Sequence, residues 1–367
     1  VMWPHRNLLA TAAATFAVVK RPVPTTPAEV AAAVRDFHEQ GRAVRLLPAA
    51  PLMHGTSAIT AVAVLSAGGT VTTLTRRSFD ADELCRAVER DRITQLTIVG
   101  DAFAKPVVAA LRRARDAGTP YDVSSLKIVV SSGVMWSARA KEELLEFCSA
   151  TLVDSLGSSE GVGFASSVAR KGATAPTAKF SLGDLARVFT EAGEEVVPGS
   201  GERGLLAVGG PIPIGYYKDP VKTAETFRTF AGRVWSVPGD WATVELDGTI
   251  TLLGRGSVCI NTAGEKVYPE EVEETLKLHE SVEDCNVVGL PDDKWGQSVT
   301  AVVALSSEAG EAPPDEAALV AHCKSHLAGY KCPKRIVFVE RVQRGPNGKP
   351  DYRWAAEAAV VRLPYGT

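Results

Sequence analysis

The segments Leu126-Lys127-Ile128-Val129-Val130 and Leu152-Val153-Asp154-Ser155-Leu156 decide the fold, because a helix-forming segment over 137–149 separates these two short, mostly apolar runs. The same alternation extends towards the N-terminus. We expect strands at 43–48, 70–74 and 96–99, and helices over 26–40, 57–67, 80–91 and 102–116. Thr26 with Glu29, and Asp80 with Glu83, have the spacing of a capping box at the start of two of these helices. Strands that alternate with helices of about 10–15 residues are typical of a parallel sheet with right-handed crossovers. The sequence therefore predicts an α/β domain.

The pattern changes after Gly157. Residues 157–254 are rich in Gly and Pro and contain short alternating strands, which predicts a β-rich half of the same large domain, spanning 1–254. Residues 255–257 are expected to be a hinge, and 258–367 a small, mobile α+β domain. In this small domain we expect helices at 270–280 and 315–328 and strands at 284–290, 299–305 and 335–339.

The composition is that of an ordinary globular protein. The 367 residues include 40 Lys+Arg and 43 Asp+Glu, with 23% charged and 45% hydrophobic residues. This balance argues against a protein that coats nucleic acid, and no apolar run reaches the roughly 18 residues of a transmembrane segment. Six cysteines without a CxxC pair indicate a reducing compartment and no structural zinc. With no export signal in view, we expect a cytoplasmic location.

Three motifs suggest chemistries that their context does not favour. Residues 199–204 fit GxGxxG, but a strand-like run follows where a dinucleotide site needs a helix, so we expect a plain turn. Residues 157–161 fit GxSxG, which keeps a serine hydrolase with Ser159 as nucleophile open as an alternative. His322 and His326 have the i, i+4 spacing of a zinc site, but the Glu of HExxH is absent, which favours a solvated helix face.

Four other segments together describe a nucleotide site. Ser158-Ser159-Glu160 follows a strand of the expected parallel sheet, where hydroxyls can contact phosphate and a carboxylate can hold a divalent cation. Gly239-Asp240-Trp241 presents an acid in a tight turn, suited to ribose hydroxyls. Arg255 lies at the expected domain boundary, and the turn-rich segment 345–349 presents Lys349.

The order and spacing of these and several other segments resemble those of the acyl-CoA synthetases of the adenylate-forming superfamily. The resemblance covers essentially the whole chain. The resembling segments are 1–8 (after the family's TSGTTGxPKG loop), 51–55 (PLxH), Ser132-Gly133-Val134 (SGG), 156–160 (YGSTE), 209–217, 223–227, Gly239-Asp240, Gly254-Arg255, 264–273 and Asn347-Gly348-Lys349. The family's phosphate-binding loop would precede Val1, so we expect this chain to be a fragment.

The resemblance implies an ATP-dependent ligase that uses ATP, Mg²⁺ and coenzyme A. A hydrophobic carboxylic acid, such as a fatty acid or a sterol side-chain acid, would react to an acyl-adenylate and then, after rotation of the small domain, to a coenzyme A thioester. The implied catalytic residues are Lys349, Glu160 (also the Mg²⁺ ligand) and Ser159. The implied nucleotide and coenzyme A contacts are Ser132, Gly133, Val134, Leu156, Gly157, Ser158, Asp240, Arg255, Gly264 and Lys266; His54 and Gly55 would line the acyl pocket.

Some positions depart from the family pattern. Leu156 replaces an aromatic residue, Ser159 replaces Thr, and Ser257 occupies a hinge position that is commonly Asp or Lys. Small apolar residues over 58–67 suit either a long acyl channel or an ordinary core. Without the phosphate-binding loop, an inactive truncated binding module is a further alternative to the ligase. A homodimer is left open as its assembly.

Overall fold

The computed structural model describes residues 1–18, 22–76, 78–134, 136–173, 178–306, 313–345 and 348–361. Pro346 and Asn347 of the turn-rich segment 345–349 lie outside the described residues. Contacts divide the chain into two units: Val1–Pro238 with Thr243–Thr251, and Gly239–Ala242 with Leu252–Thr367. The expected domain limits at 254 and 258 stay a prediction.

The first unit contains the predicted parallel strands, which lie side by side in the order β2-β1-β3-β4-β5. Their bounds are β1 Arg45–Pro48, β2 Thr70–Val71, β3 Gln95–Ile98, β4 Ile128–Ser131 and β5 Thr151–Ser158. The runs at 126–130 and 152–156 thus become neighbouring strands. The α/β class predicted from their alternation with helices is confirmed.

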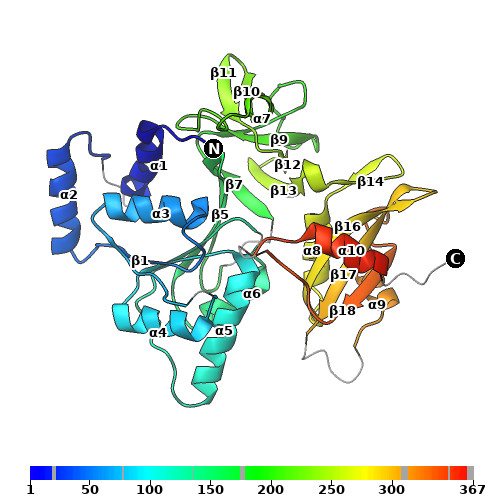
Figure 1. The fold of residues 1–367 in the computed structure, drawn as a ribbon, viewed down its shortest axis with the longest axis horizontal. Helices are drawn as coiled ribbons and strands as arrows, with labels where there is room; N and C mark the ends of the chain where they lie inside the picture. Colours follow the sequence, from blue (N-terminus) through cyan, green and yellow to red (C-terminus); the bar gives the residue numbers. More distant parts are fainter. Residues whose placement is uncertain are drawn as a thin grey trace. The chain divides into compact units, whose positions relative to one another are not determined.

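Helices cover both faces of these strands. They are α1 His5–Val18, α2 Pro27–Glu39, α3 Gly55–Ser66, α4 Ala81–Asp91, α5 Gly100–Asp116 and α6 Ala138–Leu145. Figure 1 shows α1 to α3 on one face and α4 to α6 on the other. Leu46 packs with Val64 of α3, whereas the next residue, Leu47, belongs to the core that contains Leu84 of α4 and Phe103 of α5. Successive side chains of a strand point to opposite faces, so one strand serves both cores.

Two of these helices begin at the predicted caps. The Oγ1 of Thr26 accepts a hydrogen bond from the Glu29 N–H at 3.3 Å, and the Oδ1 of Asp80 accepts one from the Glu83 N–H at 2.9 Å. Each cap satisfies one of the N–H groups that lack a partner in the first turn. The Glu29 carboxylate accepts from the N–H of Thr25, not from the N–H of the cap residue, so the reciprocal half of the capping box is shifted by one residue.

The β-rich half continues the sheet with antiparallel strands, as predicted for 157–254. The elements are β6 Gly161–Ala169, β7 Lys179–Leu182, β8 Ala186–Phe189, β9 Arg203–Val208, α7 Pro220–Thr226, β10 Phe227–Phe230, β11 Arg233–Ser236, β12 Asp240–Val244 and β13 Thr249–Arg255. The order from β5 outward is β6-β7-β13-β12-β9-β11-β10, and β8 pairs with β9. The Gly-rich segment 199–204 leads into the strand β9, so it is the expected turn.

The second unit has its own sheet, in the order β15-β14-β17-β16, with β18 parallel to β17. Its elements are η1 Gly256–Val258, β14 Ile260–Thr262, β15 Glu265–Val267, α8 Pro269–Lys277, β16 Val282–Asp292, β17 Gly296–Leu305, α9 Glu316–His326, β18 Arg335–Val339 and α10 Tyr352–Val361. Val287 packs in the core with Leu276 of α8 and Leu319 of α9, whereas Val288 packs with Ala355 of α10. Helices therefore cover both faces here too.

Helices α1, α7 and α10 and the β14–β15 hairpin were not predicted. The two hairpin strands have only three residues each, too few for an alternating pattern to be visible in the sequence. Within the part of the chain that the structure describes, no helix combines the length and the hydropathy needed to cross a membrane.

Candidate active site

The loop that follows β4 lies beside the carboxyl end of β5. Ser131 of β4 pairs with Asp154 of β5 in parallel register, so the residues after them continue side by side. Ser132 is buried, and its Oγ lies 3.8 Å from the place that a Cβ on Gly157 would take. The carboxyl edge of parallel strands is where α/β sheets bind ligands. The structure brings together the predicted nucleotide contacts Ser132, Gly133 and Val134 with Leu156, Gly157 and Ser158.

Ser159 and Glu160 form a two-residue turn between β5 and the antiparallel strand β6, because Ser158 pairs with Gly161. A nucleophile elbow requires a strand, a sharp turn and then a helix. A strand follows Ser159, so the GxSxG motif does not form an elbow. The structure around Ser159 therefore does not support the serine hydrolase alternative.

The Glu160 carboxylate is oriented by a residue 56 positions away. The Tyr216 hydroxyl donates to Glu160 Oε1 at 2.6 Å. The backbone of the turn is held as well: the Glu160 N–H donates to Ser158 Oγ at 3.2 Å, and the Trp3 Nε1–H donates to the Ser159 carbonyl at 3.0 Å. Tyr216 and Trp3 were not among the predicted site residues. The turn therefore presents a half-buried carboxylate in one orientation.

Glu160 fits a cation that is shared with a nucleotide. Among the described residues, no group of three or more His, Cys, Asp and Glu side chains could hold a metal ion. Mg²⁺ commonly binds through only one or two carboxylates together with the phosphates of a substrate. At this turn, Glu160 would supply one ligand of a cation, and the phosphate oxygens of the nucleotide would supply others.

A buried ion pair lies behind this edge of the sheet. Lys141 of α6 donates to Asp154 of β5 at 3.1 Å, and the two side chains are only 3% and 6% exposed. Burial raises the pKa of Asp154 to about 6, although Lys141 acts in the opposite direction. The pair ties α6 to the strand that ends in the Glu160 turn. Removing one partner of such a pair costs about 3–5 kcal/mol, because the other charge stays buried.

In the second unit, Asp240 and Arg255, two of the residues implied to contact the nucleotide, lie side by side. The Arg255 Nε and Asp240 Oδ1 are 3.3 Å apart, and the Asp240 side chain is the more buried of the two, at 17% exposed. The Gly256 N–H donates to the Gly239 carbonyl at 3.0 Å, which joins the two short segments that carry these side chains. Ser257, the predicted hinge residue, is exposed in η1.

Glu270, at the start of α8, packs against the same segment. Its Oε1 accepts from the Arg255 N–H at 3.4 Å, and a Cβ on Gly254 would overlap its Oε2. Among the described residues Oε2 has no hydrogen-bond partner, and it is buried. Burial, with smaller contributions from Glu273 and Asp240, raises the pKa of Glu270 to about 8. No sequence signal distinguished Glu270 from the neighbouring acids of α8.

Gly264 lies at the tip of the β14–β15 hairpin. Thr262 pairs with Glu265, so Ala263 and Gly264 form a two-residue turn, with φ values of +51° and +84°. Positive φ at both positions matches the twist of a hairpin. No atom of the described residues lies within 4 Å of a Cβ built on Gly264, so the tip is open as far as these residues are concerned. Lys266, on β15, places its Nζ 5.2 Å from the Trp241 ring centroid.

Lys349 is exposed and follows a tight turn. The Gly345 N–H donates to the Lys349 carbonyl, and the Gly348 N–H donates to the Gly345 carbonyl, each at 2.9 Å. Arg344 pairs with Pro350 in an isolated bridge that closes the turn. Backbone hydrogen bonds therefore link Gly345, Gly348 and Lys349.

The remaining predicted residues have structural contacts as well. His54 is the N-cap residue of α3 and Gly55 is its first residue, where a Cβ would be in ordinary contact with Ile59. The His322 Nε2–H donates to the Thr275 carbonyl at 2.9 Å, and burial lowers the pKa of His322. The ring centroids of His322 and His326 are 4.6 Å apart, so the two histidines pack against each other.

Comparisons with known proteins place both units in one family. The family described as "AMP-binding enzyme" matches residues 1–217, more than half of the chain, and "AMP-binding enzyme C-terminal domain" matches 271–349. The chain belongs to the AMP-binding enzyme family. The first match contains the Glu160 turn with Tyr216, and the second ends at Lys349.

Curated members of the AMP-binding enzyme family align with most of this chain. It is 44% identical over 317 residues to the "Medium/long-chain-fatty-acid--CoA/3-oxocholest-4-en-26-oate--CoA ligase" of Mycolicibacterium smegmatis, covering 86% of this chain and 57% of that protein. It is 42% identical over 324 residues to the "3-oxocholest-4-en-26-oate--CoA ligase" of Rhodococcus rhodochrous, with 86% and 56% covered. The chain thus spans little more than half the length of these relatives.

Solved structures share the fold. The amide bond synthetase McbA from Marinactinospora thermotolerans has a TM-score of 0.72 at 27% identity, covering 89% of this chain and 65% of that chain. The anthranilate CoA ligase AuaEII, in complex with anthranoyl-AMP, has a TM-score of 0.73 at 23% identity, covering 88% and 61%.

Proposed function

We propose that this chain is the larger part of an ATP-dependent acyl-CoA ligase that activates a hydrophobic carboxylic acid. The observation that carries the proposal is the likeness, at 42–46% identity, to ligases named for medium- and long-chain fatty acids and for 3-oxocholest-4-en-26-oate. The substrate would be a fatty acid or a sterol side-chain acid. ATP and coenzyme A would be the co-substrates, which fits the predicted cytoplasmic location.

The first half-reaction would join the carboxylate to the α-phosphate of ATP and release pyrophosphate. Glu160, held by Tyr216, would bind the Mg²⁺ that accompanies the phosphates, and Ser159 would contact a phosphate oxygen. The Ser132–Gly157 neighbourhood would receive adenine, with Leu156 as an apolar wall in place of an aromatic ring. Asp240, whose carboxylate lies 3.3 Å from the Arg255 guanidinium, would accept hydrogen bonds from the ribose hydroxyls.

Lys349 would stabilise the charge that develops between the α-phosphate and the attacking carboxylate. An exposed ammonium on an ordered turn can serve as a single electrostatic donor, and removing one such donor costs about 10²–10³ in rate. In the second half-reaction the coenzyme A thiol displaces AMP. Gly264, open at its hairpin tip, would leave room for the pantetheine arm.

The acyl pocket would include α3, which carries His54 at its N-cap. Ala58, Ile59 and Val62 on this helix are half-buried, so part of its apolar surface faces away from the core described above. Such a surface suits an aliphatic or steroid substrate better than a charged one.

The test joins this chain to the N-terminal segment that precedes the matching region in the Mycolicibacterium smegmatis relative. The joined protein should release pyrophosphate from ATP only with an added hydrophobic acid, and should form a thioester only when coenzyme A is added. Lys349→Ala should slow adenylate formation by about 10²-fold or more, and should leave thioester formation from pre-formed acyl-adenylate near the parent rate.

Labelling of Ser159 by a fluorophosphonate probe without any ATP-dependent thioester would refute the ligase. An equal loss in both half-reactions for Lys349→Ala would instead refute the two-conformation model, in which Lys349 serves adenylation alone. The 367-residue chain by itself should make no adenylate; turnover at the rate of the joined protein would show that the preceding segment is dispensable.

A further inference from the structure

Arg344 holds two separate pieces of the second unit with one guanidinium. Its Nε donates to Asp284 Oδ2 at 2.7 Å and its Nη2 donates to Asp284 Oδ1 at 2.5 Å, a bidentate pair. Its third group, Nη1, donates to the Gly348 carbonyl at 3.2 Å. Asp284 lies on β16, and Gly348 directly precedes Lys349. The guanidinium thus connects strand β16 to the residue that precedes Lys349.

The pair is well placed to be rigid. The side chains of Arg344 and Asp284 are only 16% and 25% exposed. Asp284 Oδ1 also accepts from the Cys285 N–H at 2.9 Å, which fixes the carboxylate on its own strand. Bidentate pairing of Arg with a carboxylate has a defined geometry that an ammonium cannot reproduce. Motion of the lysine loop is therefore opposed by β16, which is paired along its length with β17.

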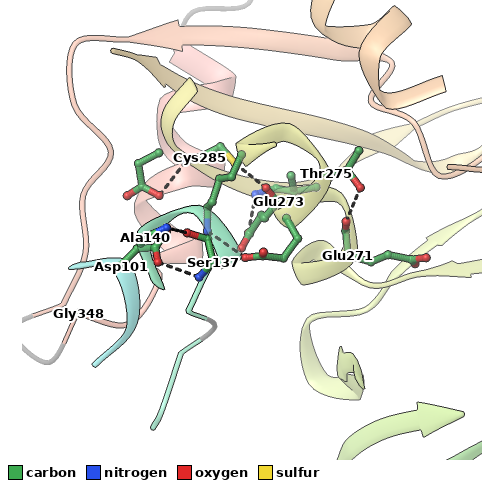
Figure 2. A network of polar contacts seen from close by, with 12 residues as sticks. Asp101, Ser137, Ala140, Glu271, Glu273, Thr275, Cys285 and Gly348 are labelled. Carbon is green, nitrogen blue, oxygen red and sulfur yellow. Dashed lines mark hydrogen bonds and ion pairs between the residues drawn. The ribbon is translucent and has the colours of Figure 1, made fainter. Parts of the chain in front are cut away.

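Other ionisable groups surround the pair. Glu273 of α8 accepts from the Val287 N–H of β16 at 2.9 Å, and the Cys285 thiol donates to the Glu273 carbonyl at 3.4 Å (Figure 2). Burial raises the pKa of Glu273, and it also raises the pKa of Tyr352. Lys277 is the second cation here; burial alone would lower its pKa, but Glu274 and its other acidic neighbours raise it. The guanidinium of Arg344 lies among groups that burial makes costly to charge, so its pairing with Asp284 is strongly preferred.

We propose that Arg344 and Asp284 are positioning residues that clamp the backbone before Lys349, so that the lysine is presented for adenylate formation. This inference rests on the proposed function for its catalytic consequence, but not for the existence of the clamp. A purely structural pair would stabilise the second unit without favouring either half-reaction. Loss of a clamp, by contrast, should slow only adenylate formation, the half-reaction that uses Lys349.

The first measurement is independent of activity. Single replacements leave one buried charge without its partner and endanger folding. The double variant Asp284→Asn/Arg344→Met removes both charges together and keeps comparable volume. In this variant, hydrogen exchange of the Gly345 and Gly348 amides should accelerate by about 10-fold or more, since opening of the turn no longer breaks the clamp.

Two controls accompany that measurement. The amides of β16 and β17 should keep their protection in the double variant, which shows that the unit is folded. Arg353→Met removes a nearby but 91%-exposed arginine that pairs with Glu357 at 3.1 Å, and it should leave the exchange of both turn amides unchanged. Unchanged exchange of the Gly345 and Gly348 amides in the double variant would overturn the clamp, whatever the protein catalyses.

The second measurement uses the joined protein. The double variant should form acyl-adenylate about 10²-fold more slowly, the loss expected for a displacement of about 1 Å in a reacting group. Thioester formation from pre-formed adenylate should stay within about 2-fold of the parent. Arg344→Lys should not restore adenylation, because an ammonium cannot bond Asp284 in bidentate fashion and Gly348 at once.

The possible failures can be told apart. Faster exchange at the turn together with unchanged adenylation, or an equal loss in both half-reactions, would overturn the positioning role. A parent protein that makes no adenylate would refute the proposed function instead, and the exchange data would still decide whether the clamp exists.

Discussion

Replacing Glu270 with Gln should change how the stability of the second unit depends on pH. The Glu270 pKa of about 8 lies well above the ordinary value of 4.5, because burial disfavours the charged form. The folded state therefore binds this proton more tightly than the unfolded state does. The contribution of Glu270 to stability is fully present below about pH 4.5 and is lost as pH rises towards 8.

The size of the effect follows from the same shift. Within this window, each unit of pH lowers the unfolding free energy of the parent by about 1.4 kcal/mol. Gln resembles the protonated acid in shape and cannot ionise. Between pH 5 and pH 7 the parent should lose about 2–3 kcal/mol of unfolding free energy relative to Glu270→Gln.

The assay follows hydrogen exchange of the β16 and β17 amides in increasing urea at several pH values, which reports on the second unit by itself. Glu357→Gln, at a 64%-exposed position, is the matched control and should run parallel to the parent. A constant difference between Glu270→Gln and the parent from pH 5 to pH 8 would show that Glu270 titrates normally and that the argument from burial is wrong.

Three further changes test neighbouring contacts. Gly254→Ala should destabilise the second unit by about 2 kcal/mol or more in urea unfolding, because its φ is +131° and its Cβ would overlap the Glu270 carboxylate; an unchanged midpoint would contradict this. Tyr216→Phe in the joined protein should weaken MgATP use by about 10-fold in kcat/KM, roughly the worth of a hydrogen bond to a charged group, and an unaltered value would exclude orientation of Glu160 by the hydroxyl. Gly264→Leu should fold, since its Cβ meets open space, and should slow thioester formation by at least about 10-fold while sparing adenylation; comparable losses in both would remove Gly264 from the thiol passage.

The sequence predicted the elements whose signals are local. Alternating apolar runs located β4 and β5, and the capping residues Thr26 and Asp80 located the starts of two helices. The predicted helix at 137–149 was too long, since α6 ends at Leu145. Such errors at element ends are expected, because the last turn of a helix is decided by its surroundings.

The site was predictable only where neighbouring residues carried it. Ser159, Glu160, Asp240 and Arg255 were singled out from their own segments and from the resemblance, but the pairing of Asp240 with Arg255 was not predicted. The Tyr216 hydroxyl that bonds Glu160 comes from 56 residues away, and no pattern within either segment encodes that contact. The raised pKa of Glu270 is likewise invisible, because α8 begins with two adjacent acids and only packing decides which of them is buried.

The pairing of β17 has a consequence for synthesis of the chain on the ribosome. Residues 300–304 of β17 pair on one side with β16, which is made earlier, and on the other side with β18, at residues 335–339. Until β18 emerges, the nascent hairpin presents an open and almost wholly apolar edge, the kind of surface that recruits other strands. Helix α10, which packs against Val302, is synthesised later still. Translation stalled between Leu305 and Arg335 should therefore leave a strongly aggregation-prone intermediate.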